Sequence, residues 1–149
     1  MLNSKVDRHL IPDYFRMTFP VLSERFVEIL QVFDVGETRF YTIDLYQSDR
    51  KTKRPEKLFI MNIVSKKSCW DRAETLNYLY GWITDTHYNF HQNAADDYLA
   101  VNSSARAGAD LWCDPSLVGC MFVSDWLKQA ISAAPLTPQI EFHRCKVTG

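Results

Sequence analysis

Apolar residues recur at helical spacing in two parts of the chain. They follow Ser23 at Phe26, Ile29, Leu30 and Phe33. They follow Ser124 at Trp126, Leu127, Ala130, Ile131 and Ala134. Because a serine hydroxyl accepts a backbone N–H that has no partner in the first turn, each serine predicts a helix N-cap. Gly36 suits a left-handed position after the first helix, and Pro135 and Pro138 end the second.

Other segments have the pattern of strands. Residues 38–47 alternate, with Tyr41, Ile43 and Leu45 on one face, which predicts a half-buried strand. Residues 57–64 and Gly119 to Val123 are apolar enough to be buried on both faces. Shorter or weaker signals predict strands at 98–102 and 139–147, with a loop at 103–108.

These elements predict an α+β fold in which a mainly antiparallel sheet packs against two or more helices. At 149 residues the chain is long enough for a single domain that buries roughly two-thirds of its unfolded surface. Residues 1–20 are weakly patterned, because Pro12 and Pro20 discourage a long helix, and we expect Tyr14, Phe15 and Phe19 to dock on the body.

Residues 65–97 are compatible with either a helix or strands. A helical stripe would use Leu76, Leu79, Tyr80, Ile83 and His87. Gly81 and the aromatic residues Tyr78, Trp82, Tyr88 and Phe90 leave strands open.

Composition and charge restrict the function. The chain is 46% hydrophobic with a net charge of −1, which argues against binding nucleic acid through a generally basic surface. No apolar run approaches the roughly 20 residues that span a bilayer, and the N-terminus lacks the apolar core of a secretory signal. We therefore expect a cytoplasmic protein with reduced, mostly buried cysteines, which are Cys69, Cys113, Cys120 and Cys145.

Two pairs of residues suggest catalysis, and each lacks a component. His87 and His91 have the spacing of zinc ligands on a helix, so a small metal-dependent hydrolase is an alternative, with Asp96, Asp97 or Cys69 as a further ligand. A hydrolase of this type would also need a glutamate where Tyr88 stands. His143 and Cys145 lack an orienting third group. We therefore expect no catalytic residue, no cofactor and no metal.

A basic segment, residues 48–56, carries Arg50, Lys51, Lys53 and Arg54 between two predicted strands. One alternative is a nucleic-acid-binding adaptor. The segment holds no aromatic residue to stack on a base, which favours a solvated hairpin tip instead.

The C-terminal third carries a recognisable order of motifs. Residues 110–115 read DLW-x-D-P, residues 122–130 read F-x-S-D-x-L-K-x-A, and an apolar segment ending in Phe142 follows. This order resembles the signature of a bacterial immunity-protein family that accompanies polymorphic toxins and secreted effectors, including those of type VI secretion. Residues 21–26, residues 58–64 and the sequence Cys69-Trp70-Asp71 resemble earlier parts of the same family.

The resemblance implies an antitoxin that is not an enzyme. Such a protein binds a cognate toxin, for example a nuclease effector, and blocks its active site without binding nucleic acid or membrane. Carboxylates can take the phosphate positions of a cationic nuclease cleft. We therefore expect partner-binding residues around the segment that the pattern leaves ambiguous, namely Asp85, Asp96, Asp97, Asp110, Trp82 and Tyr88.

Overall fold

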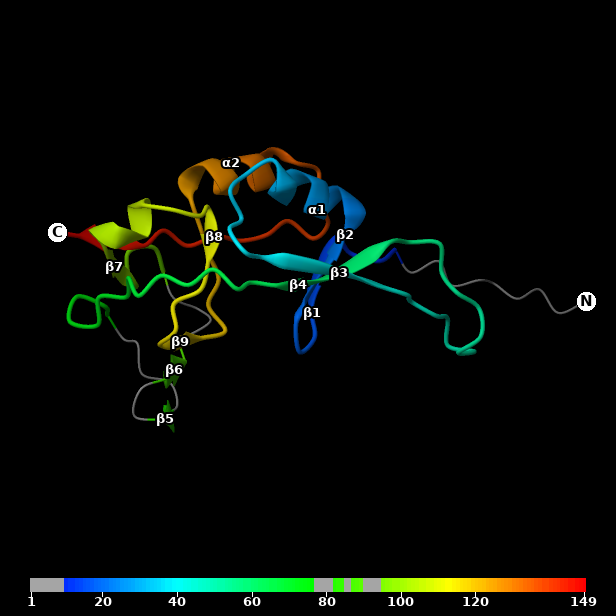
Figure 1. Cartoon of the computed structure of the whole chain (residues 1–149), viewed down its shortest axis with the longest axis horizontal. Helices are drawn as coiled ribbons and strands as arrows, with labels where there is room; N and C mark the ends of the chain where they lie inside the picture. The colour runs from blue at the N-terminus through cyan, green and yellow to red at the C-terminus, as the bar shows by residue number, and fades with distance from the viewer. Residues whose placement is uncertain (1–9, 77–81, 85–86, 90–94) are drawn as a thin grey trace, which may run out of the picture.

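The computed structural model of the chain describes residues 10–76, 82–84, 87–89 and 95–149, and it confirms the α+β fold. The largest sheet is antiparallel, and its strands follow the order β1-β2-β4-β3. They are β1 (Tyr14–Arg16), β2 (Pro20–Ser23), β4 (Leu58–Asn62) and β3 (Arg39–Ile43). Helices α1 (Glu24–Gln31) and α2 (Asp125–Ala133) pack against each other on one side of this sheet (Figure 1).

Three small sheets complete the described structure. Strand β8 (Leu111–Trp112) pairs antiparallel with β10 (Phe122–Val123), and β7 (Ala100–Asn102) pairs parallel with β11 (Lys146–Thr148). Strand β6 (His87–Asn89) lies between β5 (Trp82–Thr84) and β9 (Leu117–Val118). Residues 82–84 and 87–89 are thus strands rather than a helix, whereas Tyr78, Leu79, Tyr80, Gly81 and Phe90 lie outside the described residues.

Both predicted N-caps are confirmed. The Ser23 hydroxyl accepts the Phe26 N–H at 3.3 Å, and the Ser124 hydroxyl accepts the Leu127 N–H at 3.2 Å. Helix α1 ends at Gln31, before the predicted stripe does. Gly36 has a positive φ, as predicted, and its value is +57°. It lies in the turn that follows the helix, where a Cβ would be 2.1 Å from the Ser65 hydroxyl oxygen. Only glycine therefore fits this turn.

The first core lies between the helices and the four-stranded sheet. Its buried residues come from the helices, from this sheet, from β8 and from the segment after α2, and they are Leu22, Phe26, Val27, Leu30, Met61, Leu111, Leu127, Ile131 and Leu136. Burial on this scale is the main favourable contribution to folding, at about 25 cal/mol for each Å² of apolar surface removed from water. The two capped helices owe their stability chiefly to this face, because both are too short to persist alone.

A second core lies beyond strand β8. Its buried residues are Cys69, Tyr88, Leu99, Val101, Ala105, Trp112, Leu117 and Phe122. Leu111 belongs to the first core and its neighbour Trp112 to the second, because successive side chains of a strand point to opposite faces. The Trp112 and Phe122 rings stack at 5.7 Å between centroids, and the Lys67 ammonium nitrogen lies 3.7 Å from the centre of the Trp112 ring.

Three large side chains expected inside the molecule lie at its surface. Trp126 is 72% exposed, because Leu127 and Ile131 fill the face of α2 that meets the core, and Trp126 lies about 100° from Leu127 and about 140° from Ile131 around the helix. Tyr41 and Phe19 are each 49% exposed. In β3, Phe40 packs on the first core, whereas Ile43 and Leu45 of the predicted apolar face are half-buried and Tyr41 is exposed.

The predicted strand at 139–147 was also wrong for most of its length. Only Lys146–Thr148 is a strand, and it pairs with β7. Residues before it take irregular paths, since the Arg144 N–H donates to the Asp96 side chain rather than to a neighbouring strand. The predicted loop at 103–108 contains a short 3₁₀ helix, Ser103–Arg106.

A buried carboxylate, Asp13, ties the start of α1 to the segment after α2. It is 5% exposed and accepts hydrogen bonds from the Ser23 hydroxyl at 2.6 Å, the Thr137 N–H at 2.8 Å and the Arg25 guanidinium. The hydrogen bond from Arg25 is the largest cause that lowers the pKa of Asp13 to about 2, from 3.8. Three segments distant in sequence thus meet at one negative charge.

This charge predicts a pH dependence of stability. Because the folded-state pKa is lowered, ionised Asp13 stabilises the protein by about 2 kcal/mol above a pH of about 4, and this contribution is lost as pH falls toward about 2. Asp13→Asn is expected to lower the free energy of unfolding at neutral pH and to flatten its decline over that acidic range. Urea denaturation across the pH range measures both. Glu141→Gln, at a side chain that is 84% exposed, is the matched control. Parallel pH profiles for Asp13→Asn and the natural protein would contradict the assignment.

Candidate partner-binding surface

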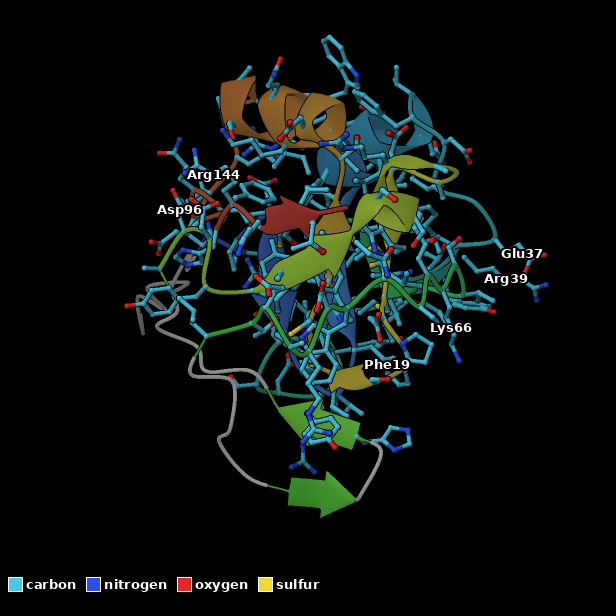
Figure 2. The ribbon with its side chains drawn as sticks, turned by 90° about the vertical axis from the view of Figure 1, so that its left-hand side faces the viewer. Phe19, Glu37, Arg39, Lys66, Asp96 and Arg144 are labelled. Atoms are coloured by element: carbon cyan, nitrogen blue, oxygen red, sulfur yellow. The ribbon has the colours of Figure 1, made fainter. Side chains whose placement is uncertain are left out.

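Two of the predicted partner-binding carboxylates meet one cation. Asp96 accepts the Arg144 N–H at 2.7 Å, and Asp97 accepts the Arg144 guanidinium through two bonds at 2.9 and 2.5 Å. Figure 2 shows Asp96 and Arg144 close together at the edge of the molecule. The hydrogen bond from Arg144 is the main cause that lowers the pKa of Asp97. The ion pair between Asp97 and Arg144 joins the loop before β7 to the C-terminal segment. The charge of Asp97 is therefore already neutralised within the chain.

The predicted carboxylate Asp110 lies elsewhere, between the ends of the two helices. Its side chain accepts the Asp34 N–H at 3.1 Å, just after α1. Its backbone N–H donates to the Asp34 carbonyl at 2.6 Å, and its own carbonyl accepts the Ser124 N–H at 2.8 Å. Asp110 therefore fixes the C-terminal end of α1 beside the N-terminal end of α2. Asp85, the remaining predicted carboxylate, lies outside the residues that the structure describes.

The predicted aromatic residue Tyr88 belongs to the second core. It is 9% exposed, and its ring centroid lies 5.2 Å from that of Trp70. The Arg72 guanidinium covers the ring at 4.7 Å and donates to the Tyr88 hydroxyl at 2.7 Å. Trp82 pairs with Tyr88 through the backbone of β5 and β6.

The aspartate of the D-P motif, Asp114, has a structural role. It is 3% exposed and accepts the N–H groups of Cys69 and Trp70 at 2.9 and 2.8 Å, together with that of Ser116 at 2.8 Å. Buried backbone donors need such partners, because an unpaired one costs free energy comparable to a lost hydrogen bond. The motif thus stabilises the second core rather than offering a carboxylate to a ligand.

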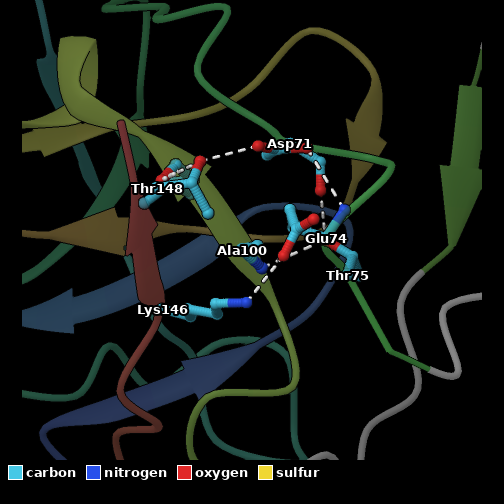
Figure 3. Close-up of polar contacts among 7 residues, drawn as sticks. Asp71, Glu74, Thr75, Ala100, Lys146 and Thr148 are labelled. Atoms are coloured by element: carbon cyan, nitrogen blue, oxygen red, sulfur yellow. Dashed lines mark hydrogen bonds and ion pairs between the residues drawn. The ribbon is translucent and has the colours of Figure 1, made fainter.

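A polar network attaches β11 to the rest of the second core (Figure 3). Lys146 bonds to Glu74 at 2.7 Å, and the Thr148 hydroxyl donates to Asp71 at 2.6 Å. Thr75 is 6% exposed, accepts the Ala100 N–H at 3.0 Å and donates to the Asp71 carbonyl at 2.7 Å. The polar groups of this network satisfy one another, which is the arrangement of a structural cross-link.

Two large exposed side chains that the sequence pattern did not select lie close in sequence to the segments that Asp110 joins. Trp126 is 72% exposed and lies two residues after Ser124. Val32 is 81% exposed and lies two residues before Asp34. Asp110 forms backbone hydrogen bonds with both Ser124 and Asp34. Asp34 and Asp125 are also exposed, and they lie within two residues of Val32 and Trp126 in the sequence. We define Val32, Asp34, Asp110, Asp125 and Trp126 as the helix-end surface. An exposed tryptophan is a frequent anchor of protein interfaces, whose rims are polar.

The described residues show little that favours catalysis. No group of three His, Cys, Asp or Glu residues among them could hold a metal ion. His87 is exposed on a strand, so it lacks the helical spacing that the metal hypothesis requires, and His91 lies outside the described residues. Burial raises the pKa of Cys120 and of Cys145 to about 11, which makes both thiols poor nucleophiles.

Among the helices that the structure describes, none has the length and apolar character needed to cross a membrane. The model of an immunity protein family, Imm11, matches residues 4–147, nearly the whole chain. No curated protein and no solved structure matches the chain.

The structural role of Asp114 predicts a large loss of stability on its removal. Asp114→Ala would leave the N–H groups of Cys69 and Trp70 without partners inside the second core, at a cost of about 2–4 kcal/mol. Chemical denaturation measures this change. Asp96→Ala, at an exposed carboxylate with one backbone partner, is the control and is expected to cost about 1 kcal/mol or less. Equal losses for the two variants would refute the role given to Asp114.

Proposed function

Because the chain belongs to the Imm11 family of immunity proteins, we propose that it binds a cognate toxin and covers the active site of that toxin. It acts by association rather than by catalysis. The observation that carries this proposal is the match of the family model over residues 4–147. Burial of the Cys145 thiol, the nucleophile of the His143–Cys145 alternative, supports the same conclusion.

The helix-end surface is the proposed centre of the contact. Tryptophan is enriched among the residues that dominate binding energy, because its large rigid ring buries apolar area at a low entropic cost. Trp126 stands on a helix whose opposite face is fixed in the first core, so the ring is presented by a rigid element. A stable interface buries about 1,200–2,000 Å² in total, so it extends well beyond this one side chain.

The carboxylates of the helix-end surface suggest the character of the toxin. Asp34, Asp110 and Asp125 come from three segments that the hydrogen bonds of Asp110 hold together. Their charges complement a cationic cleft of the kind that binds phosphate groups, so a nuclease toxin fits this surface.

The remaining predicted residues stay predictions as partner contacts. Asp96 and Asp97 already bind Arg144, so a toxin cation would compete with that residue or share its partners. Tyr88 would reach a partner only through the small part of its surface that is exposed, and Asp85 and Trp82 await their own tests. The helix-end surface is favoured because its apolar anchor is largely exposed.

The proposal is tested with the toxin domain that a neighbouring gene would encode. Expression of this domain alone is expected to stop bacterial growth, and co-expression of the present chain is expected to restore it. The purified proteins should form a stable complex in which toxin activity is lost in proportion to the chain added. Growth arrest that persists at full expression of both proteins, with no complex in solution, would sink the proposal.

The helix-end surface yields a sharper prediction. Trp126→Ala should change the free energy of unfolding by no more than about 0.5 kcal/mol, because the side chain is 72% exposed. Toxin affinity should fall by about 30-fold or more if this ring anchors the interface. Isothermal titration calorimetry with an inactivated toxin measures the dissociation constant. Leu76→Ala, at another exposed apolar side chain (55%), is the control, and a Trp126 variant that binds as tightly as this control would remove the surface from the interface.

A further inference from the structure

Strands β3 and β4 continue past the sheet as a projecting hairpin, residues 44–56, which we call the hairpin arm. Figure 1 shows it extending away from both helices, at the end of the molecule opposite β7 and β11. Among the described residues, none of the arm belongs to either core. The arm therefore contributes little to the burial that stabilises the fold.

The arm is nevertheless well ordered by its own hydrogen bonds. The Gln47 N–H donates to the Thr52 carbonyl at 2.8 Å, and the Arg54 N–H donates to the Leu45 carbonyl at 2.7 Å. At the tip, Asp49 accepts the N–H groups of Lys51 and Thr52, each at 2.8 Å. An element that is stiffened without being packed is pre-organised for a contact outside the chain, because less conformational entropy is lost on binding.

Some charged side chains of the arm pair with each other, and others do not. Asp44 pairs with Lys53 at 2.6 Å, Glu56 pairs with Arg54 at 2.8 Å, and the Asp49 carboxylate is used by the backbone of the tip. Within the described part of the chain, Arg50 and Lys51 form no ion pair. The carboxylates of Asp44 and Glu56 thus pair with Lys53 and Arg54. The tip residues Asp49, Arg50 and Lys51 together keep a net charge of +1, and the two cations point the excess outward from the turn that Asp49 closes.

The base of the arm offers a second contact. A shallow pocket of about 530 Å³ lies between residues 42–44 and 53–57. Tyr46 is 49% exposed on the strand that continues β3. A protein partner can place one side chain against this base while the charged groups of the same partner meet the tip. A nucleic acid has no side chain to place in the pocket, so the combination favours a protein. Residues 48–56, which carry the cations of the arm, include no aromatic residue that could stack on a base.

We propose that the hairpin arm is a second docking element, whose Arg50 and Lys51 bind an acidic patch on the cognate toxin. This inference rests on the proposed function and extends it. The arm reaches a part of the toxin that the helix-end surface does not, since it points away from the helices (Figure 1). A basic contact at the arm and an acidic contact at the helices would together select one orientation of the partner.

The test removes the two charges of the tip while keeping its backbone. Arg50 has a φ of +58°, a left-handed conformation that asparagine tolerates, so Arg50→Asn combined with Lys51→Gln preserves the turn. The control is Lys66→Gln combined with Arg106→Gln, which removes two exposed cations away from the arm. The probe is an inactivated form of the toxin domain from the neighbouring gene, and association and dissociation rates are measured at about 50 and 200 mM salt.

The arm variant is expected to bind the toxin about tenfold more weakly, mainly through slower association, and to lose part of the salt dependence shown by the natural protein. The control should stay within about twofold. Arm and control variants that behave alike would overturn the proposal and leave the arm a solvated hairpin tip. Loss of affinity for a 30-base-pair DNA duplex with unchanged toxin affinity would also overturn it, in favour of nucleic-acid binding. A natural protein that itself fails to bind the toxin would instead refute the proposed function, which separates the two failures.

Discussion

Buried carboxylates hold this chain together where its strands are too short to do so. Strands β8, β9 and β10 have two residues each, so their ladders supply few hydrogen bonds between distant segments. Asp13 joins the start of α1 to the segment after α2, and Asp114 joins residues 69–70 to the turn at Ser116. A carboxylate can accept several N–H donors at once, which makes one side chain a cross-link between several loops. Both cores depend on such a residue at their margin.

The parts of the fold that sequence predicts well are those set by local chemistry. Ser23 and Ser124 cap their helices because the bond joins a hydroxyl to an N–H three residues away. The continuous apolar run from Leu58 to Met61 lies in the strand Leu58–Asn62, which pairs on both edges. Which face of an element is buried depends on its neighbours instead. Trp126 and Tyr41 fit an apolar pattern, yet adjacent residues occupy the core and leave both at the surface.

Prediction of the candidate site was limited by contacts between distant residues. Asp97 and Arg144 are 47 positions apart, and no local pattern indicates that they form an ion pair. Asp110 was predicted from its charge alone, and its position between the ends of α1 and α2 follows from bonds to Asp34 and Ser124. The sequence feature that best indicates the exposure of Trp126 is its angle on the helix, because a helical projection places this residue at the edge of the apolar stripe. The motif residues Asp114, Ser124 and Leu127 are structural, so the motif identifies the scaffold rather than the surface that contacts a toxin.

The thiols of the second core have a practical consequence. Cys69 is fully buried, and burial raises the pKa of Cys120 and Cys145 to about 11, so both of these thiols are protonated at neutral pH. Alkylating reagents and mild oxidants attack the thiolate, which therefore becomes reactive mainly when local opening admits water. The rate at which these cysteines are alkylated under native conditions therefore reports the rate of that opening, and no probe has to be introduced into the protein.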